Sequence, residues 1–237
     1  MSQVKVYLFL ICFCIGVYTL RNQNHPFSIR VFDVGQGDAV YIRTPWGKAL
    51  IDGGPNYEIS RHLRKESPFG TCNLDLVVLT HPHADHKRGL ERLSTYCKLG
   101  WPQKSVYKWG DVTLVIFQPC KTCDENNSSI IVLLDYGNFE ALFMGDLESE
   151  GQSYINMERL DYYIDGPLEV YKVPHHGAKN ALNKEFLLHL RPKYCLIPVG
   201  KGNMYGHPHQ EVLSFLREIE CEVLRTDMEG SIEVFID

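Results

Sequence analysis

The sequence of 237 residues predicts a layered α/β fold in which two sheets face each other and helices lie outside them. Strand-like segments fill the first half of the chain, strands alternate with helices in the second, and a hydrophobic content of 44% is ample for a core. The net charge of −5 argues against a generally basic nucleic-acid-binding surface, although it allows a local basic patch.

The first 25 residues are interpreted as a hydrophobic segment with a polar linker, and residues 26–237 as one domain. Val6 to Leu20 is apolar apart from Thr19, yet shorter than the ~20 residues that span a bilayer comfortably. Such a run fits an uncleaved membrane anchor or a signal peptide better than a buried first helix, because it is apolar on every face. We therefore expect a membrane-anchored or secreted protein whose domain lies outside the cytoplasm.

Short runs rich in β-branched and aromatic residues, separated by Gly and Pro, predict the strands of the first half. These strands are Ser28 to Val34, Ala39 to Arg43, Lys48 to Asp52, Leu74 to Leu79, Asp111 to Phe117, Ser129 to Tyr136 and Phe139 to Met144. Helices are predicted over Tyr57 to Glu66 and Gly89 to Tyr96, and Gly137-Asn138 is typical of a two-residue hairpin turn.

The second half alternates in type. The predicted helices are Glu150 to Leu160, Asn183 to Leu190 and Gln210 to Ile219, and the predicted strands are Leu168 to Val173, Tyr194 to Val199, Val223 to Arg225 and Ser231 to Phe235. Eight cysteines include a lone Cys120-x-x-Cys123, which fits a local disulfide or two free thiols but not a zinc ribbon, since no second pair exists.

The most informative stretch follows the buried run Leu74 to Leu79. His81, His83, Asp85 and His86 fall within six positions there, and imidazoles with a carboxylate are ligands for zinc, manganese or iron. His81 and His83 can reach one metal, whereas Asp85 and His86 can reach a second beside it. The alternative is a polar loop in which a histidine caps a helix, which would need only one of the four residues.

Three later positions complete the candidate site. Asp146, after a strand and Gly145, is the candidate carboxylate between two metals, or else a turn aspartate. Adjacent residues of an extended chain point to opposite sides, so we expect one of His175 and His176 to bind metal. We assign His176 to the second metal and leave the reverse assignment open. His207 either contacts the substrate or lies in a helix N-cap region.

Two further carboxylates have a choice of roles. Asp52 either caps the Gly53-Gly54 turn or hydrogen-bonds a ligating imidazole, whereas turn chemistry is the first interpretation for Asp33 and Asp38.

The cluster His-x-His-x-Asp-His resembles the signature of the metallo-β-lactamase superfamily. The ordered motifs around Gly35-Gln36-Gly37-Asp38, Asp52-Gly53-Gly54, Gly145-Asp146, His175-His176-Gly177 and Gly206-His207-Pro208 resemble the hydrolase domain of ComEC-type competence proteins. The resemblance implies a four-layer αββα sandwich with two divalent ions, Zn²⁺ or Mn²⁺, at the sheet edge. It also favours the imidazole-bonding role of Asp52 and the bridging role of Asp146.

The sequence departs from this family at one ligand position. Many members carry a further histidine before the bridging aspartate, but no histidine lies between Lys87 and Gly145. Asn126 and Asn127 occupy the corresponding loop, and an amide oxygen suits manganese better than zinc. We therefore expect the first metal to be held by His81, His83 and Asp146, with manganese favoured.

The expected function is a metal-dependent phosphodiesterase or nuclease, acting on single-stranded DNA or another phosphodiester through a hydroxide held by the metals. Asp85, His175 and His207 are the residues expected to take part in catalysis. Cations beside the motifs, namely Lys87, Arg88, Lys172, Lys179 and Lys201, favour an anionic substrate. The alternatives are hydrolysis of another ester or amide, and a non-catalytic metal- or nucleic-acid-binding protein.

Overall fold

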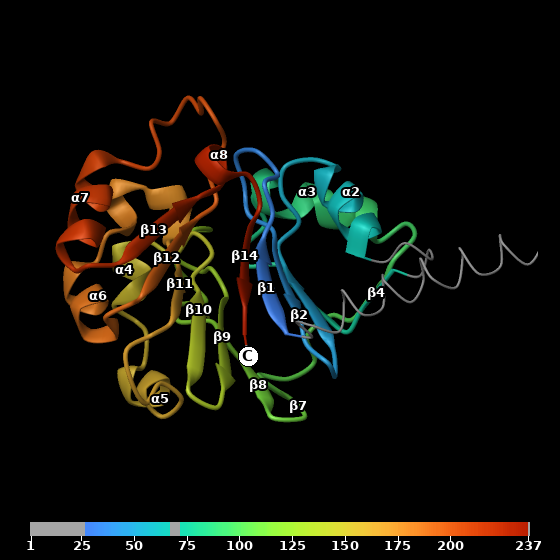
Figure 1. Ribbon diagram of the computed structural model, residues 1–237, viewed down its shortest axis with the longest axis horizontal. Coiled ribbons are helices and arrows are strands. Elements are labelled where there is room, and N and C mark those ends of the chain that lie inside the picture. Colours follow the sequence, from blue (N-terminus) through green and yellow to red (C-terminus); the bar gives the residue numbers. More distant parts are fainter. Residues whose placement is uncertain (1–26, 67–71, 237) are drawn as a thin grey trace, which may run out of the picture.

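The computed structural model describes residues 27–66 and 72–236, so the predicted hydrophobic segment Val6 to Leu20 lies outside the described part. Two sheets face each other with helices on the outer side of each, which confirms the predicted layered α/β fold (Figure 1). In the described ranges, no helix has both the length and the apolar character needed to cross a membrane.

The first sheet has five strands in the order β14-β1-β2-β3-β5. Their bounds are β1 (Ser28–Val31), β2 (Val40–Arg43), β3 (Lys48–Ile51), β5 (Leu76–Val78) and β14 (Ile232–Phe235). The last strand of the chain therefore pairs antiparallel with the first, and Ile29 lies opposite Val234. Helix α2 (Glu58–Glu66) crosses between the parallel strands β3 and β5, and helix α3 (Ala84–Leu93) follows β5.

The second sheet has seven strands in the order β13-β12-β11-β10-β9-β8-β7. These strands are β7 (Val106–Trp109), β8 (Val112–Phe117), β9 (Ile131–Tyr136), β10 (Phe139–Phe143), β11 (Val170–Lys172), β12 (Tyr194–Ile197) and β13 (Glu222–Arg225). A small third sheet pairs β4 (Asn73–Leu74) with β6 (Lys98–Leu99). Strands β10 to β13 are parallel, so their carboxyl ends meet at one edge.

The connections of the second half contain the remaining helices. They are α4 (Ser149–Gln152), α5 (Met157–Asp161), the 3-10 turns η1 (Pro174–Gly177) and η2 (Lys179–Ala181), α6 (Lys184–Leu190), α7 (Gln210–Glu218) and α8 (Thr226–Glu229). Figure 1 shows α4 to α7 on one side of the paired sheets and α2 and α3 on the other.

Three buried clusters hold these layers together, as the alternation of side chains along each strand requires. Ile42 of β2 and Phe143 of β10 belong to the cluster between the two sheets. Leu142, one residue earlier on β10, belongs instead to the cluster under α5, α6 and α7. Tyr41 of β2 packs in the third cluster with residues of α2 and α3 such as Leu90. The order helix, sheet, sheet, helix is therefore the predicted αββα sandwich.

Several predicted boundaries differ from the structure. Helix α3 begins at Ala84, five residues before the predicted start at Gly89, so part of the histidine cluster lies on the helix. The predicted helix Glu150 to Leu160 is two short helices, because the chain turns between Ser153 and Asn156, and the Asn156 side chain accepts the first-turn N–H of Arg159. Strand β7 was not predicted, and it lies at a sheet edge where its side chains are at most partly buried.

Candidate metal centre

The first four candidate ligands lie where β5 gives way to α3. His81 is buried before the helix, His83 is its N-cap residue, and Asp85 and His86 lie in its first turn. Main-chain hydrogen bonds fix that turn: Gly53 N–H donates to His86 O at 2.7 Å and Asp38 N–H donates to Asp85 O at 3.2 Å. The positions of Asp85 and His86 therefore depend on backbone contacts rather than on side-chain packing alone.

Glycine is required where α3 approaches the turn after β3. A Cβ atom on Gly89 would lie 1.8 Å from the carbonyl oxygen of Gly53, well inside contact distance. The turn itself continues from Asp52, whose φ is +60°. The helix that carries two candidate ligands thus packs directly on the backbone after β3.

Asp52 orients the imidazole of His86. The carboxylate is fully buried, its Oδ2 lies 2.8 Å from His86 Nδ1, and it accepts hydrogen bonds from Thr80 N–H and Thr80 Oγ1. His86 Nδ1 donates to this carboxylate, which leaves His86 Nε2 as the ring nitrogen turned toward the centre. Of the two roles considered for Asp52, the structure shows the hydrogen bond to the imidazole.

Asp146 lies in the middle of the histidines. Its Oδ2 is 3.2 Å from His86 Nε2, 3.9 Å from both His81 Nε2 and His175 Nε2, and 4.0 Å from His176 Nε2. Burial alone would raise the pKa of Asp146, but the His86 and His176 imidazoles hold it well below the ordinary value. The end of β10 therefore supplies a carboxylate that faces residues of both predicted metal sites.

The premise used to separate His175 from His176 is wrong. Both residues have left-handed backbones, with φ of +49° and +54°, so the chain is not extended and both rings turn toward the centre. His176 is buried, with Nε2 3.4 Å from Asp85 Oδ2 and Nδ1 donating to Pro198 O at 2.8 Å. His175 is more exposed, and its Nδ1 lies 3.3 Å from Glu148 Oε1.

The donor set fits divalent metal ions. Asp85, His86, Asp146 and His176 each offer a ligand atom, and these atoms all lie within 4.8 Å of one another. Within residues 27–66 and 72–236, His86 Nε2 and Asp146 Oδ1 are buried and have no hydrogen-bond partner, which is costly unless another group binds them. His81 Nε2 and His83 Nδ1, 3.0 Å apart, adjoin this group. Nitrogen and carboxylate donors of this kind suit zinc, manganese or iron.

His207 lies at the rim of the centre. Its ring centroid is 5.6 Å from that of His175 and 6.3 Å from that of His176. Burial, with the neighbouring His176, lowers the pKa of His207 to about 4. The N-cap of α7 is His209, so His207 lies two positions before the cap, and its ring stands beside those of His175 and His176.

Asp38 and Lys172 were misinterpreted in the sequence. Asp38 is buried rather than part of an exposed turn, and its Oδ1 lies 3.3 Å from His176 Nδ1. Lys172, predicted to face an anionic substrate, is buried, forms an ion pair with Asp38 and donates to Gly145 O at 2.7 Å. Its charge is therefore neutralised inside the protein, and its position on a strand gave no signal for this.

The other four predicted cations differ in whether they have an acidic partner. Lys179 pairs with Glu211 at 2.9 Å and Lys87 lies 3.9 Å from Glu91, whereas Arg88 and Lys201 are exposed. Lys172, Lys179 and Lys87 thus have acidic partners, which weakens the inference from these cations to an anionic substrate.

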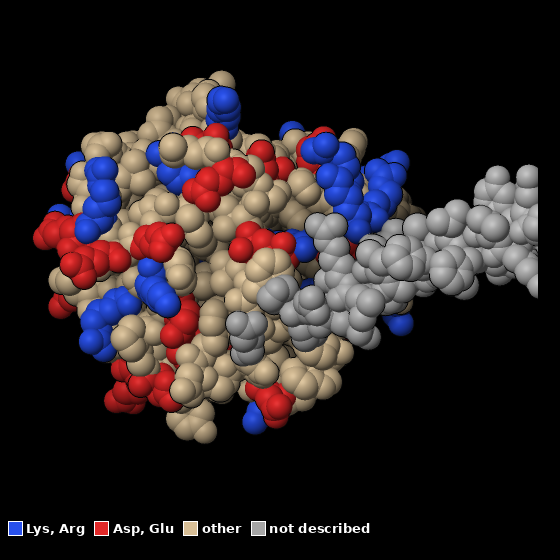
Figure 2. Space-filling view, in the orientation of Figure 1, with Lys and Arg blue, Asp and Glu red and all other residues tan. Residues whose placement is uncertain are grey.

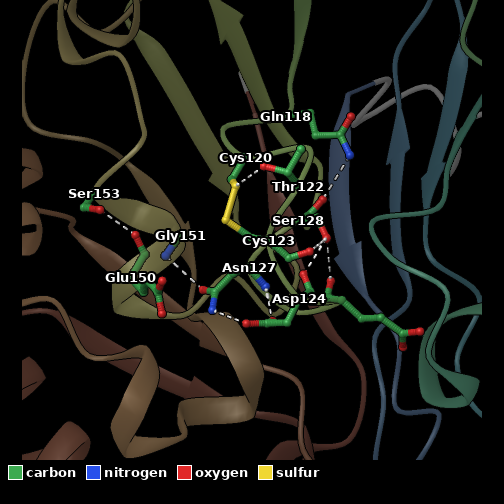
Figure 3. The surroundings of a disulfide bond; sticks show 11 residues. Gln118, Cys120, Thr122, Cys123, Asp124, Asn127, Ser128, Glu150, Gly151 and Ser153 are labelled. Carbon is green, nitrogen blue, oxygen red and sulfur yellow. Dashed lines mark hydrogen bonds between the residues drawn. A yellow bond between two sulfur atoms is a disulfide. The ribbon is translucent and has the colours of Figure 1, made fainter.

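The loop after β8 brings an unpredicted residue to the site. Glu125 Oε2 lies 2.6 Å from His83 Nε2, in the loop that lacks the additional histidine. Asn127, by contrast, accepts from Gly151 N–H through Oδ1 and donates to Asp124 through Nδ2, so its side chain is fully engaged away from the histidines (Figure 3). The disulfide Cys120–Cys123 closes the base of this loop. An exposed acidic residue in a polar loop carries no sequence signal that could have found Glu125.

A family model and two solved structures indicate the class of protein to which the chain is similar. The family model of the metallo-beta-lactamase superfamily matches residues 32–101, which include the histidine cluster and α3. Among solved structures, Tm1679, a metal-dependent hydrolase of the beta-lactamase superfamily, has a TM-score of 0.58 at 11% identity and covers 89% of this chain and 99% of its own. YhfI from Bacillus subtilis, a metallo-beta-lactamase fold protein, has a TM-score of 0.55 at 10% identity, covering 88% and 99%. The family model therefore indicates a metallo-β-lactamase superfamily domain, and these solved structures share its fold.

The curated relatives of the chain include proteins named for competence and for recombination. ComE operon protein 3 of Bacillus subtilis is 30% identical over 87% of this chain and 32% of that protein. Competence protein ComA of Neisseria gonorrhoeae is 26% identical over 87% and 32%, and Recombination protein 2 of Haemophilus influenzae is 25% identical over 95% and 31%. The chain is thus a ComEC-like relative that spans about a third of the length of these proteins.

Proposed function

We propose that the chain is a metal-dependent phosphodiesterase or nuclease. The observation that supports this proposal most is the position of Asp146. Its Oδ2 lies within 4.0 Å of imidazole nitrogens from the junction of β5 with α3 and from η1. One carboxylate shared by two groups of imidazoles is the arrangement that a two-metal hydrolase needs.

The proposed ligands fall into two groups. His81, His83 and Asp146 would hold the first divalent ion, and Asp85, His86, Asp146 and His176 would hold the second. Two bound cations would activate a water molecule and neutralise charge on the phosphoryl oxygens. Manganese remains our proposal for the first position, because the loop after β8 contains no histidine to supply a third imidazole, which leaves positions for oxygen ligands. Glu125 in this loop contacts His83 Nε2, whereas His83 Nδ1 is the ring nitrogen beside His81.

The chain's own residues would then handle the leaving group. His207 and His175 lie side by side at the rim, and an imidazole there can give a proton to the departing oxygen. His207 has a lowered pKa and His175 adjoins the Glu148 carboxylate, so we assign proton donation to His175 and substrate contact to His207. Asp85, one-third exposed, is the proposed metal ligand nearest to solvent in its group and so the one placed to contact water or substrate.

The substrate class rests on the relatives rather than on the predicted cations. The names of the relatives refer to competence and recombination, which are processes of DNA, and this favours single-stranded DNA or another phosphodiester. Hydrolysis of a different ester or of an amide is the second candidate, since Lys172 does not face the substrate.

We also propose that the domain acts outside the cytoplasm. Among the described residues, the cysteines form three disulfides, namely Cys72–Cys97, Cys120–Cys123 and Cys195–Cys221. Disulfides persist in exported proteins and are rare in the cytosol. An N-terminal anchor spanning Val6 to Leu20 agrees with this placement and stays a prediction.

Asp146→Asn tests the function directly. We expect the variant to keep its fold, to lose at least one of two metal equivalents by elemental analysis, and to lose most hydrolysis of bis-p-nitrophenyl phosphate and of single-stranded DNA. Parent protein loaded with Mn²⁺ or Zn²⁺ that cleaves neither phosphodiester would refute the nuclease proposal. If the protein then hydrolyses a carboxylic ester or an amide, the second candidate function is established. If it hydrolyses none of these substrates, the protein is a non-catalytic binding protein.

A further inference from the structure

One face of helix α3 leads away from the proposed metal centre. Asp85, Arg88 and Arg92 are spaced three and four residues apart, so their side chains lie in a row on the same face. Asp85 is a proposed metal ligand, and Arg92 lies seven residues further, which is about 10 Å along the helix axis. Arg88 and Arg92 are exposed. The row thus runs from the site to the surface.

Two hollows lie along this row. One, of about 560 Å³, is lined by Pro55, Tyr57, Arg88 and Arg92 among others. The second, of about 340 Å³, lies between α2 and the end of α3 and shares Tyr57 and Arg92 with the first. A Cβ atom on Gly37 would lie 2.7 Å from Pro55 and 2.3 Å from the Asp85 carbonyl oxygen, which places one wall of the first hollow beside the proposed site.

Aromatic rings alternate with the cations in these hollows. Tyr57 is 66% exposed and Tyr96, which lines the second hollow, is 47% exposed. The Arg92 guanidinium carbon lies 5.6 Å from the centre of the Tyr57 ring. Large rings left in solvent beside guanidinium groups are what binds unpaired bases, because every base has a face on which an aromatic ring can stack.

The surface over α2 and α3 is positive although the whole chain is negative. Figure 2 shows Lys and Arg side chains gathered in the region where Figure 1 places these helices. Nearby acidic residues are already paired: Glu58 with Arg61 at 2.5 Å, and Glu91 with Lys87 at 3.9 Å. The charge of Arg88 and Arg92 is therefore available to an anionic partner.

We propose that this surface, the α2–α3 track, binds single-stranded nucleic acid and leads it to the metal centre. Arg88 and Arg92 contact successive phosphates, and Tyr57 and Tyr96 stack on the bases. The inference rests on the proposed function and adds the place of the substrate strand. A lone phosphate would engage the arginines only, whereas the exposed rings make unpaired bases the better match.

The test measures binding without turnover. Anisotropy of a fluorescein-labelled 15-nucleotide oligothymidylate is followed with the full chain in EDTA, over a range of salt concentrations. We expect the double variant Arg88→Ala/Arg92→Ala to bind at least about tenfold more weakly and its log–log salt slope to fall by about 1.4, two phosphate contacts of ~0.7 each. Arg217→Ala, which removes an exposed arginine from α7, should bind as the parent does.

Two further probes separate charge from stacking. Arg88→Lys/Arg92→Lys should keep the salt slope, because both charges remain. Tyr57→Ala should weaken oligothymidylate binding by about 5- to 150-fold, yet leave binding of an abasic oligomer of equal charge unchanged. Circular dichroism of each variant controls for the fold.

The results that would refute the α2–α3 track differ from those that would refute the proposed function. If Arg88→Ala/Arg92→Ala binds the oligomer as tightly as Arg217→Ala does, or if the parent does not bind it, the track is refuted even when the protein hydrolyses bis-p-nitrophenyl phosphate. If binding depends on the track but no metal supports cleavage, the nuclease proposal fails and the track stands.

Discussion

Replacing Asp52 by asparagine should weaken metal binding by about 10- to 100-fold while leaving the fold intact. In the parent, Asp52 accepts from His86 Nδ1 at 2.8 Å and from Thr80 Oγ1 at 2.7 Å. The introduced amide keeps only one oxygen. If that oxygen stays with Thr80 N–H, the NH₂ group takes the place of Oδ2 and faces both His86 Nδ1 and Thr80 Oγ1. The proton of the His86 ring then moves to Nε2, the atom that faces Asp146, and His86 can no longer bind metal. In the opposite orientation the NH₂ group faces the Thr80 N–H donor, which is unfavourable.

The size of the effect follows from this switch of tautomer. Removing the partner of a ligating imidazole costs roughly 10- to 100-fold in metal affinity, which is about 1.4 to 2.8 kcal/mol. Competition titration of Mn²⁺ and Zn²⁺ against a chelating dye measures it. Asp33→Asn is the matched control, because Asp33 is an exposed turn carboxylate that accepts from Gly35 N–H. Affinities of Asp52→Asn within twofold of the control would show that Asp52 does not orient a ligand.

Three other changes have defined outcomes. Glu125→Gln should lower Mn²⁺ affinity by about two- to fivefold in the same titration, as expected for an exposed charge of ~0.5–1 kcal/mol, and unchanged affinity would exclude Glu125 from the site. Burial, with the adjacent Glu169, raises the pKa of Glu140 to about 8 from 4.5, so the folded state holds a proton that the unfolded state releases. Stability of the parent in urea should therefore fall as pH rises from about 5 toward 8, and Glu140→Gln should remove that part of the slope, whereas identical slopes would contradict the assignment. Replacing both Cys195 and Cys221 by alanine removes a disulfide of sequence separation 26 and should lower the free energy of unfolding in urea by about 3.5 kcal/mol. Removing the Cys120–Cys123 disulfide, of separation 3, should lower it by roughly 2 kcal/mol. Equal losses would count against the dependence on loop length.

The sequence predicted those features that depend on local pattern. Short apolar runs between Gly and Pro placed most strands within a few residues, and the histidine cluster after Leu79 marked the junction with α3. The family resemblance correctly supplied the four-layer order and the bond from Asp52 to an imidazole. Both depend on motifs in which neighbouring residues act together.

The features that were missed depend on contacts between distant residues. Lys172 was counted among the cations that favour an anionic substrate, because hydrophobic patterning does not show that a buried Asp38, 134 positions earlier, neutralises it. Asn126 and Asn127 were placed near the first metal because of their loop position. The Asn127 amide instead joins Gly151 and Asp124, and Asn126 Nδ2 donates to Glu148. The left-handed backbone at His175 likewise has no counterpart in the strand pattern before it.

The two sides of the proposed metal centre are held in place by different kinds of contact. Backbone hydrogen bonds and the tight approach of Gly89 to Gly53 hold the side that carries His86, whereas Glu125 reaches His83 from a loop closed by one local disulfide. A substitution in the loop can therefore alter the chemistry of the first ion at little cost to folding, but a comparable change under α3 would disturb the sheet. Among relatives of this protein, we expect differences in metal preference to arise from substitutions in the loop after β8. We expect the side of the centre formed by α3 to differ less.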